Sequence, residues 1–286
     1  MAAPNRVIAA GSRYNQMFFY DSDGHLTGST TTAPSTGAAG SPAYHIIGWK
    51  SGSPTVNEPD TVVIEADDSR LGEFQFDSVA ERRFTVDVAV NDLTLFARLL
   101  GTNVQTLGEM KVGVMDIVDA ATVNCGMLIQ GEAKNYDSGS KGVSSWEGTI
   151  IPLATAKPLG RVEYASRSEA VFRFSVSPQS ADRDPWGVTI QDSNAGTNGA
   201  TYLSITAQNP VAIHTWRGNG ALDTFTTQHV PISTAKCYLV TRIPGGGALV
   251  ATVSAVTPST KSVQLGATPA DGEEIHAVYE LSSFVE

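Results

Sequence analysis

The chain has 286 residues, 41% of them hydrophobic and 17% charged, a composition that allows a sizeable core divided between two domains. Its formal net charge of −10 argues against sequence-specific nucleic-acid binding, which needs lysine and arginine side chains at the phosphates. The 2 cysteines suggest neither a disulfide framework nor a cysteine-based metal site, and no apolar run approaches the roughly 18 residues of a membrane span.

The first third of the chain has mainly the pattern of β-strands. Residues 14–20, 61–65, 71–77 and 82–90 are rich in aromatic or β-branched side chains. Directly afterwards, residues 91–100 combine a possible Asn or Asp cap with an apolar stripe, and Gly101 follows as a stop signal. This segment predicts the one α-helix of the chain, packed flat across a sheet.

A long segment at residues 28–60 is dominated by Ser, Thr, Gly, Ala and Pro. It is interrupted by one apolar island that contains Tyr44, Ile46, Ile47 and Trp49. Loops of this length are usually functional or disordered, so the segment is either a linker or a loop that orders on assembly.

Residues 124–161 predict two strands joined by a wide turn. In the first strand, Gln130 and Glu132 alternate with small or apolar residues, and in the second Glu147 and Thr149 alternate with Trp146, Gly148 and Ile150. Pro152 lacks a backbone N–H and is expected to end the pairing. The pattern alone fits a surface hairpin with one solvated face, or a sheet that meets something on each face.

A domain boundary is expected at residues 160–168. Beyond it, about seven short strands are separated by turn signals such as those at Asn219-Gly220 and Asp271-Gly272. This spacing predicts a small all-β sandwich that is immunoglobulin-like in strand number, although the Cys, Trp, Cys spacing of true immunoglobulin domains is absent.

Motifs of known chemistry are missing from the sequence. It has no nucleophile elbow, no phosphate-binding loop and no His-Glu-x-x-His, and its 5 histidines are scattered. Residues 21–24 resemble the start of a calcium loop, but the later oxygen ligands do not follow, so a β-turn is expected there. We therefore expect no catalytic residue, no metal, no cofactor and no enzymatic activity.

Three stretches carry a family resemblance: QGEAKNY at 130–136, WEGTIIPL at 146–153 and PLGR at 158–161. Together with the long loop, the hairpin and the single helix before them, they resemble the major tail tube protein of long-tailed, siphovirus-like bacteriophages. The resemblance implies a tail-tube β-sandwich or barrel domain at residues 1–165, with residues 28–60 as an inter-ring loop. Residues 166–286 would form an immunoglobulin-like decoration domain outside the tube.

The resemblance also implies an assembly. Six copies would close a ring around a continuous inner β-barrel, and stacked rings would form a tube in the virion tail. Partners would be further copies of the chain, other tail proteins such as the tape measure and the tail terminator, and double-stranded DNA in passage. Residues 1–10 lack the order of a signal peptide, so we expect synthesis in the host cytoplasm and no membrane partner.

On this hypothesis, the polar strand faces line the bore, and their acidic and hydroxylic groups would keep DNA sliding. The lumen-facing candidates are Glu73, Gln75, Asp77, Thr85, Asp87, Gln130, Glu132, Glu147 and Thr149. The inter-ring candidates are the four residues of the apolar island. Two other hypotheses stay open: a carbohydrate- or receptor-binding module using Trp186, Tyr202 and Trp216, or another tail, baseplate or capsid-decoration component.

Overall fold

The computed structural model describes residues 7–10, 13–30, 32–56, 61–66, 69–75, 82–88, 93–100, 104–112, 123–135, 143–159, 172–179, 202–243 and 249–282. The fold is mainly β with antiparallel sheets, as predicted. None of the described helices is long and apolar enough to cross a membrane.

The strands of the first part are β1 (Val7–Ala10), β2 (Gln16–Tyr20), β3 (Leu26–Gly28), β4 (Ser41–Pro42), β5 (Tyr44–His45), β6 (Trp49–Val56), β7 (Thr61–Ala66), β8 (Ser69–Gln75), β9 (Arg82–Val88), β10 (Gln105–Leu107), β11 (Met110–Val112), β12 (Val123–Asn135) and β13 (Val143–Pro158). They are followed by β14 (Phe172–Gln179), β15 (Leu203–Ala207), β16 (Val211–Arg217), β17 (Thr224–Thr226), β18 (Cys237–Ile243), β19 (Leu249–Ala251), β20 (Val253–Thr257), β21 (Ser262–Leu265) and β22 (Glu274–Glu280). The helix α1 spans Leu93–Leu99, and two 3₁₀ turns lie at Thr234–Lys236 and Pro258–Thr260.

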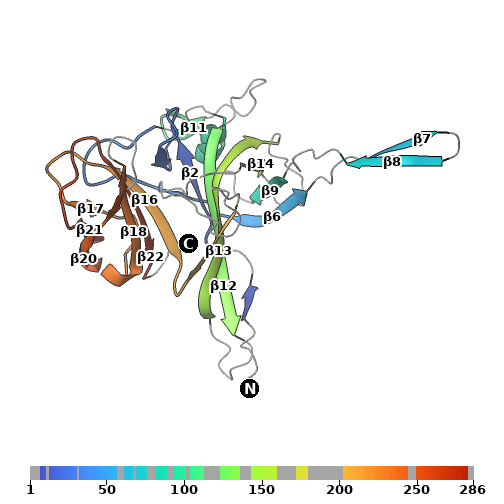
Figure 1. Ribbon diagram of the computed structural model, residues 1–286. Coiled ribbons are helices and arrows are strands. Elements are labelled where there is room, and N and C mark those ends of the chain that lie inside the picture. The colour runs from blue at the N-terminus through green and yellow to red at the C-terminus, as the bar shows by residue number, and fades with distance from the viewer. Residues whose placement is uncertain are drawn as a thin grey trace, which may run out of the picture.

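The β12–β13 hairpin is the spine of a ten-stranded sheet (Figure 1). The main strand order is β3-β2-β12-β13-β14-β9-β6, while β1 pairs with the outer part of β12 and β15 with the outer part of β13. Because β12 has 13 residues and β13 has 16, each strand pairs with one neighbour near the turn of the hairpin and with another neighbour farther from it.

Pro152 does not end the second strand of the hairpin, which corrects the prediction. Cys125 pairs with Ala154 and Met127 pairs with Ile151, so Pro152 and Leu153 together face the single residue Gly126. This is a β-bulge, where a missing N–H is tolerated because the ladder is already interrupted. The Pro152 carbonyl accepts a hydrogen bond from the Tyr20 hydroxyl.

One face of the large sheet encloses the first hydrophobic core, and the predicted helix packs there. Met17, Met127 and Ile151 from the sheet meet Leu95 and Leu99 from α1, and all five are buried. The helix is thus where the apolar stripe at residues 91–100 predicted it, from Leu93 onward.

The opposite face of the same sheet is also buried, because a second sheet covers it. This five-stranded sheet has the order β19-β18-β22-β16-β4. Phe18, Leu128 and Ile150 of the large sheet pack against Val211 and Ile213 of β16. The middle of β12 is therefore buried on both faces, and neither of its faces is a solvated one.

The five-stranded sheet shares a further core with a three-stranded sheet of order β17-β21-β20. Trp216, Phe225, Val263, Ile275 and Tyr279 lie between the two sheets and are buried. We call these two sheets the C-terminal sandwich. Apart from β4, its strands lie beyond residue 168, in the part of the chain where the sequence predicted short strands.

Residue 165 does not separate the sheets. The strands β14 and β15 follow this position but belong to the large sheet, where both pair with β13. The strand β4 precedes it but pairs with β16 of the C-terminal sandwich. A boundary drawn there would cut through both sheets.

Two hairpins project from the body (Figure 1). The β7–β8 hairpin extends to one side, and among the described strands each of its members pairs only with the other. The outer part of β12–β13, together with β1, projects in another direction (Figure 1). We call the β7–β8 hairpin the arm.

Candidate functional site

Gln130, a predicted lumen residue, lies inside the molecule. Its side-chain amide donates to the Val211 carbonyl at 2.7 Å and its oxygen accepts from the Val211 N–H at 2.9 Å. Gln130 is only 2% exposed and Val211 only 1%. The Gln130 side chain thus makes the two backbone hydrogen bonds that a neighbouring strand would make to Val211 on the edge of β16. The prediction that Gln130 lines a channel wall is corrected.

The strand register places the hairpin candidates on different faces. Glu132 pairs with Trp146, whereas Glu147 pairs with Gly131 and Thr149 with Ile129. Residues directly opposite each other in an antiparallel ladder share a face, and neighbours along a strand do not. Glu132 and Glu147 therefore point to opposite sides of the sheet and cannot line one wall together.

Two acidic candidates have cationic partners in the chain. Glu132 accepts a 2.6 Å hydrogen bond from Arg13, and Asp87 is held by Arg173 through bonds of 2.6 and 3.0 Å. Both arginines are more than half exposed. Such pairs contribute little to stability at a surface, but they neutralise the local negative charge.

The remaining lumen candidates divide into exposed and undescribed positions. Thr85, Glu147 and Thr149 are partly exposed. Glu73 and Gln75 lie on β8 of the arm, where only the backbone is described, and Asp77 lies outside the described residues.

A polar surface runs across β13 and β15. Glu147 pairs with Thr206 and Thr149 pairs with Ser204, so the four side chains share one face. Ser204 and Thr206 are exposed. We call these four residues the polar face; Ser204 and Thr206 belong to it although sequence alternation had not selected them.

The apolar island belongs mainly to the core of its own chain. Ile46 is 3% exposed, and Tyr44 and Trp49 pack against the first core. The Arg98 guanidinium lies 5.8 Å from the centre of the Tyr44 ring. Of the four inter-ring candidates, only Ile47 is an exposed side chain, at 54%.

Residues 32–46 are here called the strap; up to Ala43 the strap lies along the β16 edge of the C-terminal sandwich, and β5 then joins it to β2 of the large sheet. The N–H of Gly37 donates to the Arg217 carbonyl at 3.2 Å and that of Ala43 donates to the Ile213 carbonyl at 2.8 Å. Gly40 has φ +60°, and a Cβ there would lie 2.2 Å from Trp216. The loop predicted to bridge rings is thus attached to its own chain over much of its length.

The same edge of β16 is completed by the large sheet. The Ile213 N–H donates to Gln16 Oε1 at 3.3 Å, two residues along β16 from the Gln130 contact at Val211. Side chains of the large sheet and the backbone of the strap thus satisfy the β16 edge in turn. An edge satisfied in this way is protected from pairing with another chain.

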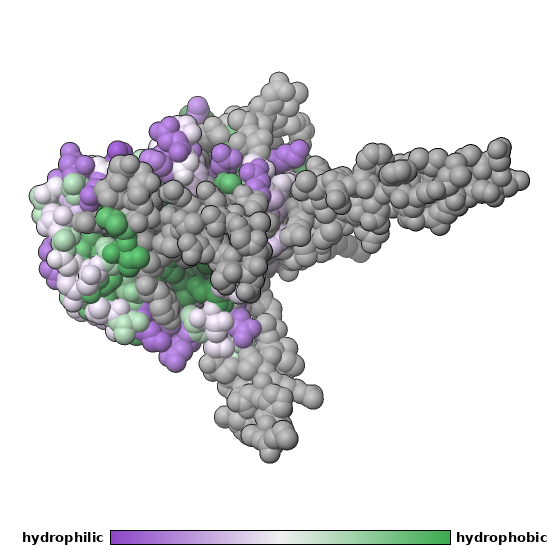
Figure 2. All heavy atoms as spheres, viewed as in Figure 1, coloured by the Kyte–Doolittle hydropathy of each residue, from purple (hydrophilic) through white to green (hydrophobic). Residues whose placement is uncertain are grey.

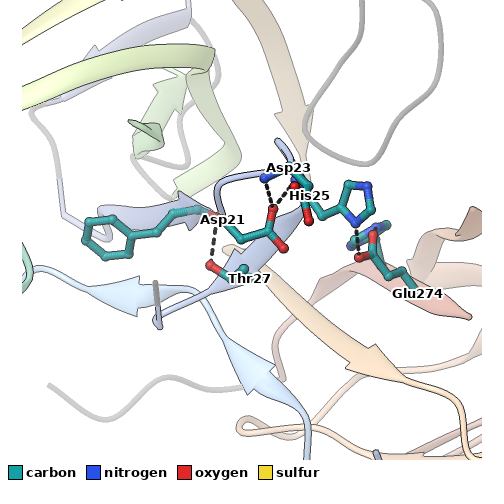
Figure 3. A network of polar contacts seen from close by, with 7 residues as sticks. Asp21, Asp23, His25, Thr27 and Glu274 are labelled. Atoms are coloured by element: carbon teal, nitrogen blue, oxygen red, sulfur yellow. Dashed lines mark hydrogen bonds and ion pairs between the residues drawn. The ribbon is translucent and has the colours of Figure 1, made fainter. Parts of the chain in front are cut away.

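A polar network joins the β2–β3 turn to β22 (Figure 3). Asp21 Oδ1 accepts from the N–H groups of Asp23 and His25 at 3.0 and 2.8 Å. His25 Nδ1 lies 2.7 Å from Glu274 Oε1, and the other oxygen of Glu274 lies 3.6 Å from His276 Nε2. The predicted β-turn at residues 21–24 is confirmed.

Two features of the described residues bear on metal binding and on nucleophilic chemistry. Within the described residues, no group of three or more His, Cys, Asp or Glu side chains is arranged to hold a metal ion. Cys125 and Cys237 are free and buried, and burial raises the pKa of each thiol to about 12. Thiols with such pKa values are poor nucleophiles near neutral pH.

The histidines gather in a way that sequence spacing did not indicate. His45 and His229 both lie against Tyr14, with ring centroids 4.5 and 5.9 Å away, and His214 stacks on Trp216 at 4.3 Å. No local signal could have found this group, because the contacts that form it are distant in sequence: Tyr14 and His229 are 215 residues apart.

Exposed apolar residues mark the sandwich. Figure 2 shows hydrophobic residues gathered over part of its surface, and Leu249 and Val250 on β19 are 54% and 72% exposed. Apolar side chains on a strand at the side of a sheet favour a protein partner. The aromatic residues of the carbohydrate hypothesis fit less well: Trp216 is 1% exposed, Tyr202 is 36% exposed, and Trp186 lies outside the described residues.

No protein-family model matches the chain, and no curated protein matches it.

Proposed function

We propose that this chain is the structural subunit of a bacteriophage tail tube, polymerising as stacked hexameric rings whose lumen conducts DNA from the capsid to the host. The observation that carries the proposal is the projecting arm. The arm indicates that the chain assembles, and the resemblance of the β12–β13 segment to tail tube proteins indicates which kind of assembly it forms.

The arm is expected to pair with a strand of another subunit. A single two-stranded hairpin is at best marginally stable in water, and stability normally needs a third strand or a packed face. The described part of the chain gives β7 and β8 no further strand. A neighbouring subunit would supply one, and repetition of that contact from copy to copy gives a ring or an open tube.

The position of the C-terminal sandwich narrows the choice of lumen surface. Near β12 and β13 the sandwich covers the side of the large sheet that carries Phe18 and Leu128. A channel wall there would have to be on the other side, where Glu147, Thr149, Ser204 and Thr206 form the polar face. A carboxylate and three hydroxyls offer no cation to phosphate, so DNA would pass without sticking.

On this proposal the sandwich supports the large sheet from the side away from the lumen, and it is not a detachable decoration. Truncation after Arg161 would remove β14 and β15 from the large sheet and uncover Leu128 and Ile150. We expect the truncated chain to lose its fold, so its failure to assemble would not reveal what the sandwich does.

Negative-stain electron microscopy of the concentrated protein tests the proposal directly. Wild type should form hollow rings or tubes. A variant in which an Asn-Gly turn replaces residues 61–75 should remain a folded monomer, with wild-type circular dichroism as the control for folding. A monodisperse wild-type monomer at every concentration would contradict the proposal and favour a binding module.

The lumen assignment has a separate test with a matched control. Glu147→Lys should make assembled tubes retain double-stranded DNA at low salt, because it places a cation on the polar face. Glu109→Lys makes the same charge change at the exposed β10–β11 turn and should leave DNA passage unchanged. Equal DNA retention by the two variants would refute the assignment of this face to the lumen.

A further inference from the structure

The strap is held near its middle by a buried histidine. His214 lies on β16, is 2% exposed and stacks on the Trp216 ring with an interplanar angle of 7°. Its Nδ1 lies 3.3 Å from the backbone nitrogen of Gln228, and its Nε2 lies 3.0 Å from the Ala39 carbonyl of the strap.

These two partners define the protonation of His214. A backbone N–H can only donate, so Nδ1 of His214 must be its unprotonated, accepting nitrogen. Nε2 then carries the single proton and donates it to Ala39. The ring is neutral in this arrangement, and a second proton on Nδ1 would face the Gln228 N–H with a donor against a donor.

A second histidine lies near the end of the strap, where Tyr14 stands between it and His45. His229 Nε2 lies 2.9 Å from the Tyr14 hydroxyl, which accepts from Gln16 Nε2 at 3.1 Å and can donate its own proton to His229. The Tyr14 ring in turn lies 4.5 Å from that of His45, on β5 where the strap ends. This arrangement also uses a neutral imidazole as an acceptor.

The surroundings of the two imidazoles do not favour added positive charge. His229 and His214 repel each other when charged, and His45 and Lys261 act on His229 in the same direction. Tyr14 and Tyr279 also face His229, and burial keeps both hydroxyls protonated by raising their pKa.

We infer that His214 and His229 form a pH-controlled lock that holds the strap on the C-terminal sandwich while both are neutral and releases it in acid. Opening breaks the bonds of Gly37 and Ala43 to β16, and so frees both the strap and the β16 edge for other partners. The lock does not depend on the proposed assembly, because all its groups lie in one chain.

The direction of the pH effect follows from burial. Desolvation lowers the pKa of His214 from 6.5 to about 3, and it also lowers the pKa of His229. A group with a lowered pKa in the closed state stabilises that state above its ordinary pKa and loses this contribution as the pH falls toward the closed-state value. The closed strap is therefore stable at pH 7 and is weakened progressively below about pH 6.5.

Hydrogen exchange of the strap measures the lock. After correction for the intrinsic pH dependence of exchange, protection of peptides covering residues 36–46 should fall on the order of 100-fold between pH 7.5 and pH 4, given the His214 pKa of about 3. Peptides covering residues 123–130 of β12 should stay better protected than the strap at both pH values, which separates strap release from global unfolding.

Two variants make the test specific. His214→Gln keeps a donor and an acceptor but cannot be protonated, so its strap protection should become nearly independent of pH. His229→Gln should flatten the profile in part, and it serves as the second test where the first variant does not fold. His25→Gln removes a histidine that contacts Glu274 and should keep the wild-type profile.

The inference is overturned if strap protection in wild type is the same at pH 7.5 and pH 4. It is overturned equally if a folded lock variant retains the full wild-type pH dependence, or if β12 is no better protected than the strap at pH 4.

Discussion

Replacing Gln130 with leucine should destabilise the protein strongly, although the sequence pattern presents this residue as polar and solvated. Gln130→Leu keeps the approximate volume of the side chain and removes both of its hydrogen bonds to Val211. The N–H and C=O of Val211 would then lose these partners in a position that is 1% exposed.

The magnitude follows from those two groups. A buried backbone group without a partner costs about 2 kcal/mol, which gives about 4 kcal/mol for the pair. Burial of the added apolar atoms returns about 1.5 kcal/mol. We therefore expect the free energy of unfolding to fall by about 2.5 kcal/mol.

Urea unfolding followed by tryptophan fluorescence measures this loss as a lower midpoint with an unchanged slope. Gln105→Leu is the matched control, because Gln105 is exposed on β10, and it should change the free energy of unfolding by less than about 0.5 kcal/mol. If Gln130→Leu behaves like this control, the contact between Gln130 and Val211 does not hold the two sheets together. The prediction that Gln130 lines the lumen would then stand again.

Three further predictions concern the strap, the thiols and acid stability. Gly40→Ala should lower the free energy of unfolding by about 2 to 3 kcal/mol, because its φ of +60° is strained for alanine and the new Cβ would meet Trp216 at 2.2 Å. Gly24→Ala, with φ +84° and nothing within 4 Å, should cost only about 1 kcal/mol, and thermal unfolding of both variants measures the difference. Both cysteines should resist iodoacetamide at pH 8 in the native protein and react fully in denaturant, since burial raises their pKa to about 12; rapid native labelling would refute this burial. The free energy of unfolding should fall by roughly 3 kcal/mol between pH 7 and pH 4 through His214, whose pKa is lowered to about 3, and His214→Gln should show a shallower decline than wild type in urea titrations at each pH.

Local patterns predicted much of the secondary structure. The apolar stripe of α1 and the alternating residues of β9 and β12 report packing within one turn or one strand, so they can be read without knowing the partner. The short strands β4 and β5 were missed because two residues carry no periodicity. Their formation depends on the sheets that they join.

The candidate site was harder to predict than the strands. Glu147 and Thr149 are on the exposed polar face, but Glu132 lies on the other side of the sheet. Alternation shows that two residues of one strand share a face; it does not show which face of the next strand joins them. That relation is set by the register of pairing, which a one-residue slip would reverse.

The sequence by itself determined that the chain is mainly β, that one helix follows β9, and that β12 and β13 are strands, because these features depend on neighbours a few positions away. Only the tertiary structure decided that Gln130 is buried, that the strap lies on the sandwich, and that the histidines form a group. Gln130 meets Val211 across 81 positions and His214 meets Ala39 across 175. Contacts at such separations leave no periodic trace in the sequence, because they arise from how whole sheets pack on one another.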